Sequence, residues 1–327
     1  MPFIETRNLS KTFQVLEKKS GLLASVSGLF SRKYKSISAV EDVSFSVEEG
    51  EIVGFLGPNG AGKTTTLKML SGLLYPSAGS ARVMGYVPWE RSVEFRKSFS
   101  LVMGQKNQLW WDLPAADSFE LHKEIYALDE QEFRKTIHEL TNLFDVERLM
   151  FKPVRELSLG ERMKFELIAS LLHKPRLLLL DEPTIGLDVV AQSAIHRCLA
   201  EYNRSRKTTI LLTSHYMRDV ESLCSRILVI SGGKLIYGGD IKGLKERFNT
   251  NKILKIQFLN QVPETMKLDL PGALIKDGVL VCNVRKEDVP RVMGMVAQCE
   301  DVVDIVIEEP PLEEVIEKLF QEHKSEK

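Results

Sequence analysis

The chain has 327 residues and a formal net charge of −1, with 43% hydrophobic and 27% charged residues. This composition excludes the disordered, fibrous and membrane-spanning classes, and the near-neutral charge argues against a nucleic-acid partner. The four cysteines are scattered without a Cys-x-x-Cys pair, and the N-terminus shows no secretory signal, so we expect a protein of the reducing cytoplasm.

Predicted strands and helices alternate along most of the chain. Apolar runs predict strands at residues 3–9, 43–47, 51–56, 177–180, 209–213 and 227–230. Helices are expected at residues 63–74 and, as a charged amphipathic stretch, at residues 115–150. This alternation predicts an α/β fold with helices on the faces of a mostly parallel sheet.

The character of the sequence changes after residue 241. Strands are predicted at residues 253–258, 279–284 and 302–307, and helices at residues 286–298 and 312–322. We therefore expect a first domain over residues 1–245 and a small accessory α+β domain over residues 250–327.

A glycine-rich segment between the strand at 51–56 and the helix at 63–74 fits the phosphate-loop pattern G-x-x-x-x-G-K-[ST]. It consists of Gly57, Pro58, Asn59, Gly60, Ala61, Gly62, Lys63 and Thr64. Its backbone N–H groups form an anion nest at a helix N-terminus, where Lys63 reaches the outer phosphates. Thr64 offers a hydroxyl to Mg²⁺, and Thr65 contacts an inner phosphate oxygen. The expected ligands are therefore ATP and Mg²⁺.

Two adjacent carboxylates, Asp181 and Glu182, follow the apolar run at residues 177–180. The carboxyl ends of parallel strands are where ligands bind in open sheets. We expect Asp181 to hold Mg²⁺ through water, and Glu182 to polarise the attacking water as the general base. Paired acids also begin many solvated loops, and it is the phosphate loop that favours the catalytic role here.

Together with Leu157-Ser158-Leu159-Gly160-Glu161, these motifs resemble, in kind and in order, those of nucleotide-binding subunits of the ABC transporter superfamily. The resemblance covers residues 3–244. It implies a P-loop NTPase cassette with a mostly parallel core sheet, an antiparallel β subdomain and a helical subdomain at about residues 105–170.

The resemblance also implies roles for four single residues. Gln105 occupies the glutamine-loop position, whose residue contacts the nucleotide and binds Mg²⁺. Asp188 belongs to the aspartate loop that crosses the dimer. His215 matches the switch histidine at the γ-phosphate, which makes it catalytic together with Glu182 and Lys63. Phe13 is implied to stack on adenine, although a phenylalanine there could instead pack under the sheet.

In this family the signature grips the nucleotide of the partner subunit, so Ser158, Leu159, Gly160 and Glu161 are implied to act in trans. Leu159 replaces a glycine and Glu161 a glutamine of the usual form, so a stiffer loop and extra negative charge near phosphate are expected. Ser158-x-x-Glu161 before an apolar helix is also a capping box, and the two roles are compatible.

Residues 16–36 form an insert that is less typical of the family. Apolar residues recur at helical spacing from Leu23 to Tyr34, flanked by the basic residues Lys18, Lys19, Arg32, Lys33 and Lys35. Such a segment can lie on an anionic membrane face or dock on a partner helix. Gly21 and Gly28 weaken a helix and favour a solvated loop instead.

A second less typical segment is Trp110-Trp111-Asp112-Leu113-Pro114. In the family this region faces the membrane subunit, so its tryptophans are either interface anchors or filling for the core of the helical subdomain.

The full pattern most resembles subunits paired with type-2 ABC export permeases. The resemblance implies an ATPase that works as a homodimer or with a paired ABC subunit, bound to two membrane-spanning permease subunits. It places the chain peripherally on the cytoplasmic face of the cell membrane. The alternatives are an importer subunit and a soluble, non-transport ABC ATPase, which usually carries two cassettes or a long coiled coil.

Overall fold

The structure is a computed structural model that describes residues 2–16, 34–104, 106–214, 216–248, 251–260, 273–276, 278–299 and 301–325. The chain divides into two compact units, Met1–Gly239 and Asp240–Lys327. Within the described residues, no helix is both long and apolar enough to cross a bilayer.

The centre of the first unit is a six-stranded sheet in the order β5-β6-β7-β3-β8-β9. Its strands are β3 (Ile52–Leu56), β5 (Phe99–Met103), β6 (Leu177–Asp181), β7 (Thr209–Ser214), β8 (Arg226–Ser231) and β9 (Lys234–Asp240). The pairs formed by β3, β5, β6, β7 and β8 are parallel, and every residue of β6 and β7 is buried. The predicted mostly parallel core sheet is confirmed.

A second sheet of the first unit has the order β2-β1-β4 and is antiparallel. Its strands are β1 (Ile4–Leu16), β2 (Tyr34–Val47) and β4 (Ala78–Val83). Strands β1 and β2 are much longer than predicted, and Leu16 pairs with Tyr34. The helical spacing read at Tyr34 was therefore wrong, because this end of the insert is strand. Residues 17–33, which carry the rest of the insert, lie outside the described residues.

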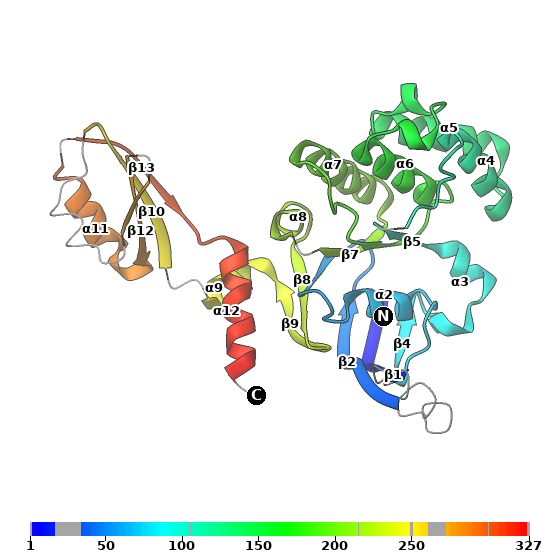
Figure 1. The fold of residues 1–327 in the computed structure, drawn as a ribbon, viewed down its shortest axis with the longest axis horizontal. Helices are drawn as coiled ribbons and strands as arrows, with labels where there is room; N and C mark the ends of the chain where they lie inside the picture. Colours follow the sequence, from blue (N-terminus) through cyan, green and yellow to red (C-terminus); the bar gives the residue numbers. More distant parts are fainter. Residues whose placement is uncertain are drawn as a thin grey trace, which may run out of the picture. The chain divides into compact units, whose positions relative to one another are not determined.

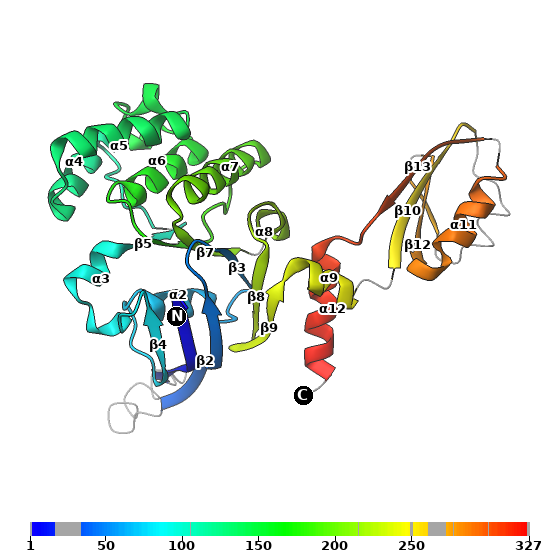
Figure 2. The same ribbon diagram turned by 180° about the vertical axis from the view of Figure 1, so that it is seen from behind.

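Helices surround these sheets: α2 (Lys63–Leu70), α3 (Val93–Ser98), α4 (Ala115–Tyr126), α5 (Glu130–Leu143), α6 (Leu159–Leu171), α7 (Val189–Arg206) and α8 (Met217–Leu223). Figures 1 and 2 show α4, α5 and α6 grouped on one side of the parallel strands, with β1, β2 and β4 on the other.

Two predicted helix lengths were wrong. The stretch expected at residues 115–150 is broken at Ala127, which has a φ of 52°, and Asp129 caps the start of α5. Helix α2 ends at Leu70 rather than near residue 74, because Gly72 turns the chain with a φ of +71°. A Cβ at Gly72 would lie 2.1 Å from the carbonyl oxygen of Pro88, so only glycine fits there.

The second unit is an α+β arrangement with a four-stranded antiparallel sheet in the order β11-β12-β10-β13. Its elements are α9 (Ile241–Phe248), β10 (Asn251–Phe258), β11 (Leu274–Lys276), β12 (Val279–Arg285), α11 (Val289–Val296), β13 (Val302–Glu308) and α12 (Leu312–Ser325). Alternate residues of β10 and β12 pack with α11 into a core that includes Leu254, Ile256, Leu280 and Val292.

Candidate active site

The glycine-rich loop runs from the end of β3 to the first turn of α2. Gly62 caps α2 with a φ of +109°, and a Cβ there would lie 2.5 Å from the carbonyl oxygen of Ala39. A Cβ at Gly57 would lie 2.3 Å from the carbonyl oxygen of Ile230. The loop is therefore pressed against neighbouring backbone at both ends, and side chains at these two positions would force it open.

This loop borders a hollow of about 150 Å³, lined by residues 59–65, Ala39 and Glu182. The predicted phosphate-loop residues and Glu182 thus come together around one space at the N-terminus of α2. A helix N-terminus with converging backbone N–H groups stabilises anions, so phosphate is the ligand class that this hollow favours.

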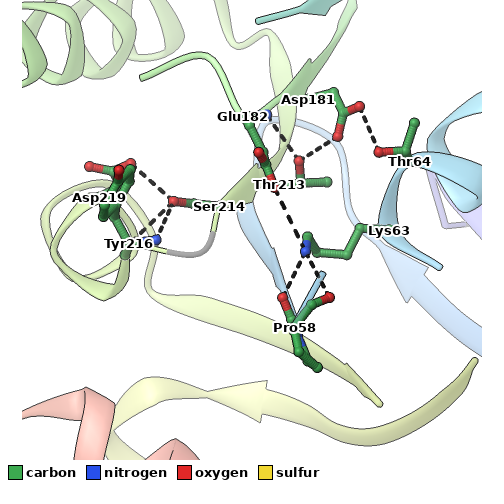
Figure 3. A network of polar contacts seen from close by, with 10 residues as sticks. Pro58, Lys63, Thr64, Asp181, Glu182, Thr213, Ser214, Tyr216 and Asp219 are labelled. Carbon is green, nitrogen blue, oxygen red and sulfur yellow. Dashed lines mark hydrogen bonds and ion pairs between the residues drawn. The ribbon is translucent and has the colours of Figure 1, made fainter. Parts of the chain in front are cut away.

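Lys63 is the cation of this hollow, and its side chain is 5% exposed. Its Nζ donates to the carbonyl oxygens of Gly57 (2.7 Å) and Pro58 (3.2 Å), and lies 3.8 Å from Oε1 of Glu182 (Figure 3). Burial lowers the pKa of the Lys63 ammonium from its usual value, while Glu182 and Asp181 oppose that shift. The loop therefore carries a largely desolvated ammonium group, which interacts with an anion more strongly than an exposed lysine does.

Asp181 ends β6 and links two hydroxyl groups. Oγ1 of Thr64 donates to Oδ2 of Asp181 (2.8 Å), and Oγ1 of Thr213 donates to Oδ1 (2.7 Å). Figure 3 shows this chain of contacts beside Lys63. The Thr64 hydroxyl and the Asp181 carboxylate offer neighbouring hard oxygen donors, which fits Mg²⁺.

Glu182 follows Asp181 in an unusual backbone conformation, with a φ of 54°. A left-handed conformation costs about 1 to 3 kcal/mol in a residue with a side chain. The backbone N–H of Glu182 donates to the carbonyl oxygen (3.2 Å) and to Oγ1 (3.0 Å) of Thr213, and these bonds hold the turn. The turn directs the Glu182 carboxylate towards Lys63 and the hollow (Figure 3).

The chain that leads to Gln105 is fixed against the same two carboxylate residues. Gly104 donates its backbone N–H to the carbonyl oxygen of Asp181 (2.9 Å), and a Cβ on Gly104 would lie 2.3 Å from the carbonyl oxygen of Glu182. Gln105 and His215 themselves lie outside the described residues, so their predicted roles stay predictions.

The signature segment begins α6, and the predicted capping box is confirmed. Ser158 is the N-cap: Glu161 donates its backbone N–H to Ser158 Oγ (3.2 Å). Glu161 Oε2 accepts from the backbone N–H and from the hydroxyl of Ser158, both at 2.8 Å. These bonds, the backbone one foremost, lower the pKa of the Glu161 carboxyl. The glutamate is thus bound to its own helix N-terminus.

Two more signature positions contact the segment that follows Glu182. A Cβ at Gly160 would lie 2.9 Å from Cβ of Ala191, and one at Gly186 would lie 3.3 Å from Cδ2 of Leu159. Asp188 caps α7 by accepting the backbone N–H of Ala191 (2.8 Å). The signature and aspartate-loop residues do not line the hollow of their own chain. Such an arrangement fits residues that serve another chain.

Phe13 lies in β1, opposite Ile37 of β2, and its side chain is 37% exposed. The ammonium group of Lys11 lies 5.4 Å from the ring centroid. Phe13 does not line the hollow, and its exposed ring favours a stacking surface over packing under the sheet.

The tryptophan segment lies on the surface, with Trp110 50% and Trp111 46% exposed, which favours the interface reading over core filling. It is tied to α6 through Glu166, a buried carboxylate that accepts the backbone N–H groups of Gln108 (2.9 Å) and Leu109 (3.4 Å). Burial raises the pKa of the Glu166 carboxyl, against the effect of these bonds. Glu166 was not predicted as a functional residue, although an acid between the apolar residues Phe165 and Leu167 was the available signal.

The phosphate loop, the acidic strand end and the sheet that brings them together define an ATP-hydrolysing P-loop cassette. The family model described as ABC transporter matches residues 40–185. The ABC transporter ATP-binding protein NatA of Bacillus subtilis (strain 168) is 35% identical over 224 residues, covering 68% of this chain and 91% of that protein. The chain belongs to the ABC transporter family, as an ATP-binding subunit with ATPase activity.

Two further similarities extend this result. The human cholesterol transporter ABCA5 is 28% identical over 343 residues, covering 99% of this chain but only 20% of that much longer protein. A solved dimeric structure of a post-hydrolysis state of an ATP-binding cassette, bound to ADP and Pi, matches with a TM-score of 0.60 at 23% identity. The match covers 72% of this chain and 98% of that chain, and it concerns the fold alone.

Proposed function

We propose that this chain drives an exporter by closing on ATP as a dimer and reopening after hydrolysis. The observation that carries the proposal is the meeting of Lys63, Thr64 and Glu182 at one hollow, with Asp181 bonded to Thr64 behind it, while Ser158 of the same chain does not line that hollow. A hollow that holds the phosphate-loop lysine and the proposed base but no signature residue is best explained by a second subunit that supplies the signature. The partner is a second copy or a paired ABC subunit.

Each side chain has a defined task in the proposed reaction. Glu182 accepts a hydrogen bond from the attacking water and removes its proton as the general base. The Lys63 ammonium stabilises the negative charge that develops on the γ-phosphoryl oxygens. Thr64, Gln105 and, through water, Asp181 would hold Mg²⁺, which would neutralise phosphate charge. Ser158 and Gly160 of the opposite chain close on the γ-phosphate, and His215 contacts it from the chain's own side.

Coupling to two membrane-spanning permease subunits is proposed to run through the tryptophan segment. Trp110 and Trp111 present exposed rings, and aromatic side chains of this kind are common anchors of interfaces. Glu166 and Arg162 attach the segment to α6, since the Arg162 guanidinium lies 5.4 Å from the Trp111 ring. A movement of the signature helix would therefore carry this surface with it. The chain would sit peripherally on the cytoplasmic membrane face.

The export direction is supported by the signature and tryptophan run, which resemble those of subunits paired with type-2 export permeases. Transport, without a stated direction, is the activity named for the cholesterol transporter that matches over 99% of this chain. That relative is far longer, so its cargo is not carried over.

The test is Glu182→Gln. An amide cannot serve as the base, so turnover should fall roughly 10² to 10⁴-fold while ATP binding persists. The variant should also form a long-lived ATP-bound dimer, seen as a doubled mass in light scattering only with ATP. Glu94→Gln, which alters an exposed carboxylate of α3, is the control and should behave like the unmodified chain. Turnover within a few-fold of normal in Glu182→Gln would refute the assignment.

A further inference from the structure

Asp219 of α8 is a fully buried carboxylate that the proposed chemistry does not use. Its Oδ2 accepts hydrogen bonds from the hydroxyls of Ser214 (3.0 Å) and Thr184, and its Oδ1 lies 3.2 Å from Nε2 of His196. Burying a charged carboxylate costs free energy unless hydrogen bonds compensate for the lost water. Losing any of these hydrogen bonds would therefore be unfavourable, and Asp219 holds the segments that carry its partners together.

Two of these segments are parts of the proposed active site: the end of β7 and the loop that follows Glu182. Ser214 is the last residue of β7 and directly precedes His215. Its Oγ also accepts the backbone N–H of Tyr216 (2.9 Å), so this hydroxyl joins Asp219 to the start of the segment that leads into α8 (Figure 3). Thr184 lies two residues after Glu182, in the loop that leads to Asp188.

The same loop reaches the signature. Gly186, two residues beyond Thr184, lies against the side chain of Leu159, because a Cβ at Gly186 would be 3.3 Å from Cδ2 of Leu159. A single buried carboxylate therefore connects the end of β7 to a loop that carries Glu182 at one end and touches the signature helix near the other.

We infer that Asp219 is a positioning residue for ATP hydrolysis, whose carboxylate makes the end of β7 and the loop from Glu182 to Asp188 move as one piece. The inference rests on the proposed function, since it assigns a shared movement to two segments that meet ATP. It predicts that breaking either hydroxyl bond misplaces Glu182 relative to the γ-phosphate while the phosphate loop still binds nucleotide.

The experiment compares Thr184→Val with Thr184→Ser in the full chain. Valine keeps the branched shape and removes the hydroxyl, whereas serine keeps the hydroxyl. We expect kcat to fall roughly 10 to 100-fold in Thr184→Val, because small misplacements of reacting groups cost rates of this size. The Kd for a fluorescent ATP analogue should change by less than about twofold, and Thr184→Ser should restore most of kcat.

A matched control and a double variant separate positioning from general stability. Ser222→Ala removes a hydroxyl that contacts Nδ1 of His196 (2.9 Å) and the carbonyl oxygen of Asp219 (2.9 Å), but neither flanking segment. It should lower the melting temperature about as much as Thr184→Val and leave kcat nearly unchanged. Thr184→Val combined with Ser214→Ala should lose less kcat than the product of the single losses, because both bonds end on one carboxylate oxygen.

Equal kcat in Thr184→Val and Thr184→Ser would overturn the inference, as would multiplicative losses in the double variant. If Glu182→Gln is inactive at the same time, the proposed function survives that result. Normal turnover in Glu182→Gln would instead remove the proposed base, and the positioning role of Asp219 with it.

Discussion

His173 offers a test of the structure that does not depend on ligands. The residue follows α6, and its imidazole stacks on the ring of Tyr126 with the centroids 3.9 Å apart and the planes 7° apart. Nε2 lies 3.2 Å from the carbonyl oxygen of Phe99, so the neutral ring donates there. Nδ1 is buried and has no hydrogen-bond partner among the described residues. A proton placed on Nδ1 would therefore be buried without an acceptor.

This environment lowers the pKa of His173 from 6.5 to about 4, with burial as the main cause and nearby His122 as a further one. Between pH 6.5 and 4 the unfolded chain binds a proton that the folded chain excludes. The free energy of unfolding must then decrease as the pH falls through this window. At 1.36 kcal/mol for each tenfold change in the proton-binding constant, the loss is about 2 kcal/mol at pH 5 and about 3 kcal/mol at pH 4.

The assay is urea unfolding at pH 7, 6, 5 and 4.5 for the unmodified chain, His173→Phe and His173→Gln. All three tryptophans lie in the first unit, so their fluorescence reports the unfolding of that unit. Phenylalanine keeps the stack on Tyr126, and glutamine keeps a donor for Phe99. Neither variant titrates, so both should gain about 2 kcal/mol relative to the unmodified chain between pH 7 and pH 5. A difference that stays constant with pH in both variants would refute the reasoning.

Two other predictions concern partners. A Ser158→Arg chain mixed with a Lys63→Ala chain should regain ATPase, because one composite site in the mixed dimer is intact; a mixture as inactive as either parent would contradict the sandwich. The insert has five basic residues and one acid, a local charge of +4, and each basic residue adds about 1 kcal/mol near an anionic leaflet. Flotation with anionic liposomes at low salt should therefore detect binding by the unmodified chain. The triple variant Arg32→Ser, Lys33→Ser, Lys35→Ser should lose this binding and keep its ATPase activity. No binding by the unmodified chain would reject a membrane-facing insert.

The phosphate loop and the acidic pair could be predicted because their information is local. Gly57 to Thr64 are consecutive residues of one loop and the helix start that follows it, and Asp181 is the last residue of the buried strand β6. Thr213 could not be predicted as a partner of Asp181, since the two residues are 32 positions apart and meet only because β6 and β7 are neighbours. The same holds for Asp219, whose partners come from a strand end, a loop and a helix.

The strand lengths failed for a different physical reason. Residues beyond Leu9 in β1 are mostly exposed or half-buried, so they lack the alternation of buried and exposed residues that identifies a strand. Their strand conformation comes from pairing with β2, which the sequence does not reveal locally. The break at Ala127 was missed because alanine favours helix, and the left-handed turn is stabilised by its surroundings rather than by its own preference.

The two departures from the usual signature act on the proposed mechanism in different ways. The Glu161 carboxylate accepts both the backbone N–H and the hydroxyl of Ser158, so its charge is already satisfied at the helix N-terminus. For Ser158 to donate to a γ-phosphate, that hydroxyl must leave Glu161, and closing the dimer exchanges one charge-assisted hydrogen bond for another. A neutral glutamine would hold the hydroxyl less strongly, so glutamate makes the proposed closure less favourable. Leu159 has a different effect, because its contact with Gly186 links the signature to the loop that follows Glu182. Glu161, which disfavours the proposed closure, thus lies two positions from Leu159, which would link that closure to the position of Glu182.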